Sequence, residues 1–105
     1  MQTYGLYLNG QFVETETSID VTNPATEESI ARVCTADKKK VLTAIKDAHN
    51  AFLSWRELTA RTRGDYLLKV AAVMEARKDE IARVMTMEAG KALNGSVAEV
   101  AGSID

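Results

Sequence analysis

Few side chains in this 105-residue sequence are of the types that perform chemistry, and the single cysteine is the first candidate. A cysteine nucleophile has to be ionised, which requires a helix N-terminus, a histidine or a cation beside the thiol. Cys34 stands just before a predicted helix start at Thr35, but the sequence places no base near it. A lone cysteine without such partners is usually a small buried hydrophobic residue, and this is the interpretation we favour.

His49 and Glu88 are the other two candidates. His49 is the only histidine, and no cysteine or carboxylate cluster surrounds it at metal-ligand spacing, so we expect a half-exposed helix residue. Glu88 continues an apolar stripe, and a buried carboxylate needs a partner. Lys91 follows three residues later near a helix end, so the spacing predicts a structural ion pair rather than a ligand contact.

The sequence lacks the local motifs that identify common active sites. Its six glycines are too scattered to form a phosphate-binding loop, and no Gly-x-Ser-x-Gly, Cys-x-x-Cys or His-Glu-x-x-His occurs. The charged runs Lys38–Lys40 and Glu75–Glu80 are most simply solvated. The residues alone therefore assign no catalytic, cofactor-binding or metal-ligating side chain, and they predict a soluble mixed domain of unknown role.

The first third of the sequence has β-strand character. Apolar residues alternate over Tyr4–Leu8, and the Asn-Gly pair that follows predicts a type I′ hairpin to Gln11–Val13. Ile19–Val21 is a second short strand. It ends at a turn over Asn23–Thr26, because the residue before a proline is held extended. Ser29–Cys34 is a third strand, whose poor alternation leaves its two faces unassigned.

The remaining two thirds predict four amphipathic helices. Thr35 or Asp37 can cap the first helix and Thr59 the second, and the third is expected to end at Gly90. After an Asn-Gly break, Ser96–Glu99 has the pattern of a capping box that opens the fourth helix. The four apolar stripes are Val41, Ile45, Ala48, Phe52 and Trp55; Leu67, Val70, Ala71 and Met74; Ile81, Val84 and Met85; and Val97, Val100, Ala101 and Ile104.

Composition excludes several classes of protein. The net charge of −2 disfavours a nucleic-acid partner. No basic segment precedes an apolar run at the N-terminus, and the longest apolar stretch is far shorter than the roughly 20 residues of a membrane span. One cysteine cannot form an internal disulfide, so we expect a soluble, cytoplasmic protein. The last helical pattern reaches Asp105 without a terminating residue, which predicts an incomplete domain.

The order of motifs along the chain is more informative than any one of them. After the Asn-Gly hairpin come Asn23-Pro24-Ala25-Thr26-Glu27-Glu28, Ile30-Ala31-Arg32-Val33, Ala48-His49-Asn50-Ala51-Phe52-Leu53-Ser54-Trp55, Arg61-Thr62-Arg63, Leu67-Leu68, Met87-Glu88-Ala89-Gly90-Lys91 and Ala98-Glu99-Val100. Over all 105 residues this pattern resembles the N-terminal segment of the NAD(P)-dependent aldehyde dehydrogenase superfamily. Bacterial succinate-semialdehyde dehydrogenases share it, as do several other subfamilies, so the segment selects no substrate.

The resemblance implies a mixed α/β fold, in which a short N-terminal β-hairpin and strands precede about four helices. Residues 1–105 would be the incomplete front part of a Rossmann-like cofactor-binding domain. The intact protein would oxidise an aldehyde to a carboxylic acid with NAD or NADP, through a cysteine thiolate and a thioester that water hydrolyses. The family's nucleophilic Cys, general-base Glu and oxyanion-hole Asn lie downstream, and neither Cys34 nor Glu88 matches a catalytic motif. The segment alone is therefore expected to be inactive and to bind no dinucleotide.

The resemblance also implies partners. These are the rest of the parent chain, the aldehyde, and further copies in a homo-oligomer. Some family members hold a structural monovalent cation, and Val21, Thr22 and Glu99 correspond to the region of its ligands. The alternative hypothesis is a free-standing α+β or helical interaction module whose apolar stripes bind a partner helix. A nucleic-acid binder that uses Lys38–Lys40 is disfavoured by the negative net charge.

Overall fold

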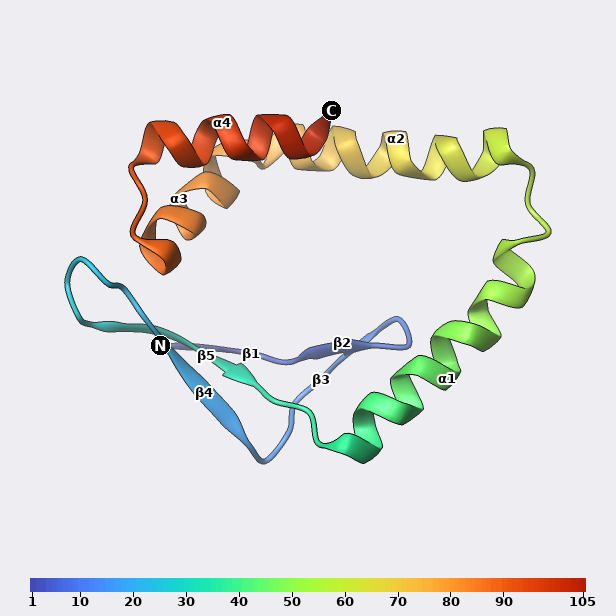
Figure 1. The fold of residues 1–105 in the computed structure, drawn as a ribbon, viewed down its shortest axis with the longest axis horizontal. Coiled ribbons are helices and arrows are strands. Elements are labelled where there is room, and N and C mark those ends of the chain that lie inside the picture. The colour runs from blue at the N-terminus through green and yellow to red at the C-terminus, as the bar shows by residue number, and fades with distance from the viewer. The chain divides into compact units, whose positions relative to one another are not determined.

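A computed structural model describes residues 1–105, in which five strands precede four helices (Figure 1). This order confirms the predicted mixed α/β architecture. The chain divides into two compact units. The first comprises residues 1–22 and 29–58, and the second comprises residues 23–28 and 59–105.

A three-stranded sheet forms the centre of the first unit. Its strand order is β1 (Gln2–Tyr4), β5 (Ser29–Cys34) and β4 (Ser18–Thr22), with β1 parallel and β4 antiparallel to β5. The central β5 has neighbours on both sides and partly buries consecutive residues, which explains why its sequence does not alternate cleanly. Asp20 and Arg32 stand opposite each other on β4 and β5 and form an ion pair of 3.1 Å.

The hairpin of β2 (Leu6–Leu8) and β3 (Gln11–Val13) forms a separate two-stranded sheet. Asn9 and Gly10 have φ values of 49° and 78°, so both central residues of the turn have the positive φ that a type I′ turn requires. The predicted hairpin is therefore confirmed.

The expectation of one alternating strand over Tyr4–Leu8 is wrong. The chain leaves the three-stranded sheet after Tyr4 and joins the hairpin at Leu6, so the break falls at Gly5. A Cβ atom at Gly5 would lie 2.8 Å from the carbonyl oxygen of Val13. Glycine is thus needed at this position because two backbone segments approach closely.

Helix α1 (Lys38–Trp55) completes the first unit. Of the two predicted caps, Asp37 is the one used, since its Oδ1 accepts a hydrogen bond of 2.8 Å from the backbone N–H of Lys40. Thr35 has another role. Its hydroxyl lies 2.7 Å from that of Thr17, and its backbone N–H donates to the carbonyl oxygen of Thr17 at 2.9 Å.

Three helices make up most of the second unit: α2 (Ala60–Ala76), α3 (Lys78–Ala89) and α4 (Leu93–Ile104). Thr59 caps α2 as predicted, by accepting from the N–H of Thr62 at 3.1 Å. Gly90 ends α3 in the left-handed conformation, with φ 76° and ψ 9°. The predicted end of the third helix at Gly90 is therefore confirmed.

The predicted capping box at Ser96–Glu99 is wrong. Helix α4 begins at Leu93, with Ala92 at the N-cap and no side chain that caps it. Ser96 is completely buried, and its hydroxyl lies 2.8 Å from the hydroxyl of Thr86 on α3. The Asn-Gly pair that suggested a break lies inside the first turn of α4, because contacts between the helices outweigh its weak helix propensity.

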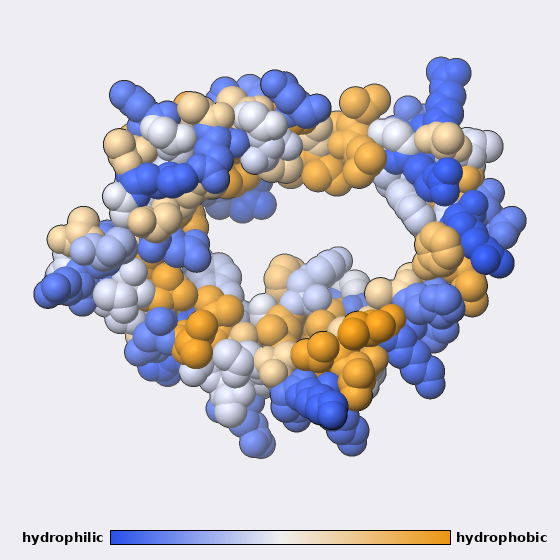
Figure 2. Space-filling view, viewed as in Figure 1, coloured by the Kyte–Doolittle hydropathy of each residue, from blue (hydrophilic) through white to orange (hydrophobic).

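Large apolar side chains remain exposed on α1 and α2. Ile45 and Phe52 of α1 are 61% and 47% exposed, and Leu67 and Val70 of α2 are 68% and 55% exposed. Figure 2 shows such hydrophobic side chains at the surface of both helices. Much of the first two predicted stripes is therefore not covered within the chain itself. None of the four helices combines the length and the apolar character needed to cross a membrane.

Candidate functional site

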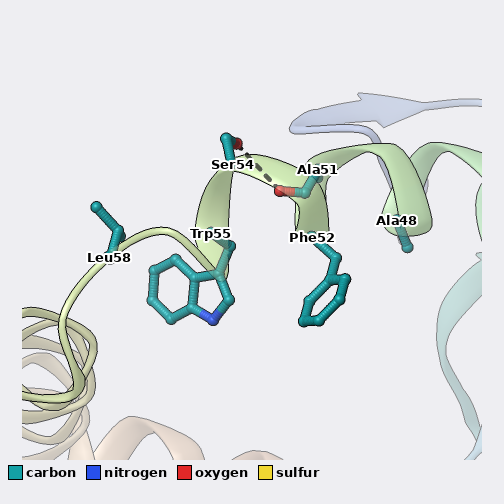
Figure 3. Close-up of a pocket in the computed structure, with 6 residues that line it drawn as sticks. All are labelled: Ala48, Ala51, Phe52, Ser54, Trp55 and Leu58. Atoms are coloured by element: carbon teal, nitrogen blue, oxygen red, sulfur yellow. Dashed lines mark hydrogen bonds between the residues drawn. The ribbon is translucent and has the colours of Figure 1, made fainter.

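An apolar hollow of the first unit lies at the C-terminal end of α1. Ala48, Phe52 and Trp55 follow one another at helical spacing, and the rings of Phe52 and Trp55 project from the same side of the helix (Figure 3). The turn after the helix brings in Leu58, whose backbone N–H donates to the carbonyl oxygen of Trp55 at 3.1 Å. Together with Ala51 and Ser54 these residues line a hollow of about 650 Å³, which we call the α1 hollow.

The α1 hollow carries no ionisable side chain. The hydroxyl of Ser54 donates to the carbonyl oxygen of Ala51 at 3.1 Å. The guanidinium of Arg56, which does not line the hollow, lies 5.9 Å from the centre of the Phe52 ring. A surface of this composition can pack against another apolar surface, and its one hydroxyl, that of Ser54, has no base beside it among the lining residues.

A second, polar hollow lies where the segment after β3 meets the end of β5. The hydroxyl of Thr15 donates to the carbonyl oxygen of Thr35 at 2.9 Å, and the hydroxyls of Thr17 and Thr35 are 2.7 Å apart. Its other lining residues are Glu14, Glu16, Asp37 and Lys40. The threonine hydroxyls are thus used to tie two chain segments together.

Cys34 is buried, with 4% of its surface exposed. Its Sγ accepts a hydrogen bond of 3.5 Å from the backbone N–H of Thr15 and lies 4.0 Å from the carbonyl oxygen of the same residue. Helix α1 starts at Lys38 rather than at Thr35, so the thiol does not adjoin a helix N-terminus. The predicted burial of Cys34 is therefore confirmed.

His49 is exposed on α1, and the lysine run opens the same helix. Lys38 and Lys39 are exposed and Lys40 is half-buried, which agrees with the expectation that the run is solvated. No group of three or more histidine, cysteine, aspartate or glutamate side chains is placed to hold a metal ion.

The predicted pair of Glu88 and Lys91 is wrong. Glu88 is exposed, and the ammonium group of Lys91 forms an ion pair with the carboxylate of Glu99 on α4. The left-handed conformation of Gly90 ends the helix, so Lys91 no longer follows the helical spacing that would place it beside Glu88.

The hypothesis of a structural cation concerns three residues in two units. Val21 and Thr22 lie at the end of β4 in the first unit, where the pairing with β5 is irregular, and Glu99 lies on α4 in the second. In this structure the carboxylate of Glu99 is paired with Lys91. The cation site stays a prediction.

A charged pair stabilises the junction between α2 and α3. Arg77 donates two hydrogen bonds to the carboxylate of Glu80, from Nε at 2.9 Å and from Nη2 at 2.7 Å. These hydrogen bonds, and secondarily the opposite charges, lower the pKa of Glu80 and raise the pKa of Arg77. The pair is on the surface, so it orders the junction rather than forming a site.

Neither the α1 hollow nor the polar hollow fits a dinucleotide. A pyrophosphate needs backbone N–H groups at a glycine-rich loop or cationic side chains. The α1 hollow offers neither, and the polar hollow has the carboxylates of Glu14, Glu16 and Asp37 against one ammonium group, that of Lys40.

Sequence reasoning missed the polar contacts between segments. The pair of Thr86 and Ser96 and the contacts among Thr15, Thr17 and Thr35 join residues that are distant in sequence. A single sequence contains no signal for such pairs, because threonine and serine are mostly found exposed to solvent, without a partner in the protein.

Residues 12–105 match the sequence profile described as the aldehyde dehydrogenase family, so the chain belongs to this family. A 1-pyrroline-5-carboxylate dehydrogenase of Staphylococcus haemolyticus is 37% identical over 105 residues, which cover 99% of this chain and 20% of that protein. The chain thus spans about a fifth of the length of the curated relatives it matches.

Solved structures show the same relationship. The lactaldehyde dehydrogenase of Escherichia coli matches 99% of this chain and 22% of its own, with 34% identity and a TM-score of 0.95. A point mutant of the betaine aldehyde dehydrogenase of Staphylococcus aureus, solved in complex with NAD⁺, matches 92% of this chain and 20% of its own, with 32% identity and a TM-score of 0.88. The strands and helices described above are therefore the N-terminal part of the family's fold.

Proposed function

We propose that this chain is the N-terminal segment of an enzyme that oxidises an aldehyde to a carboxylic acid with NAD or NADP, and that the segment acts as scaffold. One observation carries the proposal: nearly the whole chain matches a fifth of much longer dehydrogenases. In this proposal the nucleophile and the base of the reaction belong to the rest of the polypeptide.

The α1 hollow supports the scaffold role. Phe52 and Trp55 are 47% and 39% exposed, and the hollow they line is apolar, as expected for a surface that packs against another part of the same protein. In this proposal residues 1–105 are the front part of the cofactor-binding domain. Their contribution to catalysis is to hold that domain in shape.

The proposal extends to the partners of the intact enzyme. These are an aldehyde substrate, a nicotinamide cofactor and further copies of the chain in a homo-oligomer. A cytoplasmic location fits a chain with one free and buried cysteine, because thiols stay reduced there. The free-standing interaction module is the weaker hypothesis, since membership of the family already accounts for the exposed apolar surfaces.

The test compares residues 1–105 with the full polypeptide that contains them. Each is incubated with NAD or NADP and a panel of small aldehydes, and cofactor reduction is followed by absorbance. We expect turnover by the full polypeptide and none by residues 1–105. Aldehyde-dependent reduction by the short chain would overturn the scaffold role. A full polypeptide that binds the dinucleotide but oxidises no aldehyde would overturn the proposed activity.

A further inference from the structure

Two segments that are distant in sequence meet in the second unit. The ring of Pro24, in the turn over residues 23–28, lies directly against Gly90 at the C-terminus of α3. A Cβ atom added to Gly90 would be 2.7 Å from Cγ of Pro24 and 3.5 Å from its Cβ. Real Cβ atoms do not approach other carbon atoms to 2.7 Å, so only glycine fits beneath the ring.

The turn that presents Pro24 is held by its own hydrogen bonds. Oδ1 of Asn23 accepts from the backbone N–H of Ala25 at 2.9 Å, and the carbonyl oxygen of Asn23 accepts from the N–H of Glu27 at 2.8 Å. The N–H of Asn23 donates to the carbonyl oxygen of Glu28 at 2.9 Å, which closes the turn. Proline adds a fixed φ, so the ring is presented by a stiff segment.

The other partner is the end of a helix. The backbone N–H of Gly90 donates to the carbonyl oxygen of Thr86 at 2.9 Å, and its φ of 76° turns the chain out of α3. Two separate requirements therefore select glycine here, the left-handed backbone and the space that Pro24 occupies.

Gly10 separates these two requirements. Its φ is 78°, almost the same as that of Gly90, but a Cβ atom there would have no neighbour within 4 Å. A substitution at Gly10 thus measures the cost of the left-handed backbone alone. The same substitution at Gly90 measures that cost together with the contact to Pro24.

We propose that the Asn23–Glu28 turn is a strap over the C-terminus of α3, and that Pro24 packed on Gly90 makes the turn and the helix end order together. The strap is itself the segment that connects β4 to β5 in the sequence. Lys91, the next residue after the contact, pairs with Glu99 of α4, which extends the ordered region to the following helix. This inference does not depend on which reaction the intact enzyme performs.

The experiment uses the full polypeptide and four variants: Gly90→Ala, Pro24→Ala, the double variant of both, and Gly10→Ala. Thermal unfolding should show that Gly90→Ala lowers Tm by about 2 °C or more beyond the loss caused by Gly10→Ala. In the double variant, removal of the ring should recover most of that difference. Pro24→Ala alone should make deuterium exchange in the peptide that contains Gly90 roughly tenfold faster.

Equal Tm losses for Gly90→Ala and Gly10→Ala would overturn the proposal, as would a Gly90→Ala loss that Pro24→Ala does not reduce. If Gly90→Ala does not fold, Asn23→Ala replaces it, because that change loosens the turn and leaves both contact partners in place. Faster exchange around Gly90 in Asn23→Ala supports the strap, and unchanged exchange refutes it. None of these measurements uses enzyme activity, so they can fail while the proposed function stands.

Discussion

Replacing Phe52 by lysine is expected to affect the intact enzyme and the 105-residue chain in opposite directions. Phe52 lines the α1 hollow, and 47% of its surface is exposed in the chain alone. If downstream polypeptide covers the hollow, a charge at this position is buried in the intact enzyme. In the short chain the same charge stays in water and interrupts an apolar surface that would otherwise promote association.

The expected magnitude follows from the exposed part of the ring. A phenylalanine side chain buries about 200 Å² when fully covered, so an exposed fraction of 47% leaves roughly 90 Å² for a partner to cover. At about 25 cal/mol per Å² this area is worth roughly 2 kcal/mol. A buried ammonium group without a partner costs several kcal/mol more. The sum is a large part of the roughly 5–15 kcal/mol by which a folded domain is stable.

Asn50→Lys is the matched control. Asn50 is exposed on α1 two residues before Phe52, so it lies on the opposite side of the helix, and its substitution adds the same charge. Tm and soluble yield are measured for the full polypeptide, and sedimentation velocity gives the association state of the short chain. We expect Phe52→Lys to lower Tm and yield strongly in the full polypeptide, and to reduce association of the short chain.

The reasoning is refuted if the full polypeptide tolerates Phe52→Lys as well as Asn50→Lys. That result would mean that the α1 hollow stays open to solvent in the intact enzyme. The exposed ring would then need an explanation other than contact with the rest of the polypeptide.

Three further predictions concern the second unit. Ser96→Ala should lower the free energy of unfolding by about 1 kcal/mol in urea titrations, because it deprives the hydroxyl of Thr86 of its partner at 2.8 Å; an unchanged midpoint would show that the pair adds nothing. The lowered pKa of Glu80 means that its pair with Arg77 stabilises the fold above the ordinary carboxyl pKa and is lost as the pH falls through the lowered value. The Glu80→Gln variant should therefore be slightly less stable than the parent at neutral pH, and this difference should shrink at high salt and vanish in acid. A difference in stability that appears only in acid would contradict the lowered pKa. Gly64→Ala should raise the Tm of the full polypeptide, followed by circular dichroism, by an amount that corresponds to roughly 0.5–1 kcal/mol, because a Cβ atom at this position in α2 meets nothing within 4 Å. A lower Tm would point to a neighbour of Gly64 in the intact protein.

Features set by a few neighbouring residues could be predicted from the sequence. The hairpin at Asn9 and Gly10 depends on the positive φ that these two residues accept, and the helix boundaries at Asp37, Thr59 and Gly90 depend on groups within one turn. The family resemblance rested on the order of several of these local features.

Features set by distant contacts could not be predicted. The break at Gly5 depends on the backbone of Val13, and the partner of Lys91 is Glu99 rather than Glu88 because Gly90 turns the chain. Helical periodicity gives the face that a residue occupies but not the residue at which a helix starts. For the same reason the α1 hollow was predicted only as a stripe, since its shape depends on how the chain turns after Trp55.

The core of the second unit supports the proposed scaffold role. Its fully buried side chains are small, namely Ala82, Ser96 and Val100, which allow α3 and α4 to approach closely but bury little apolar area. Larger apolar residues such as Leu67 and Val70 remain exposed on α2. Because hydrophobic stabilisation grows with buried apolar area, most of what this chain can gain lies in surface that it does not cover itself. If the proposed scaffold role is correct, substitutions in this segment should change stability and assembly before they change the chemical step.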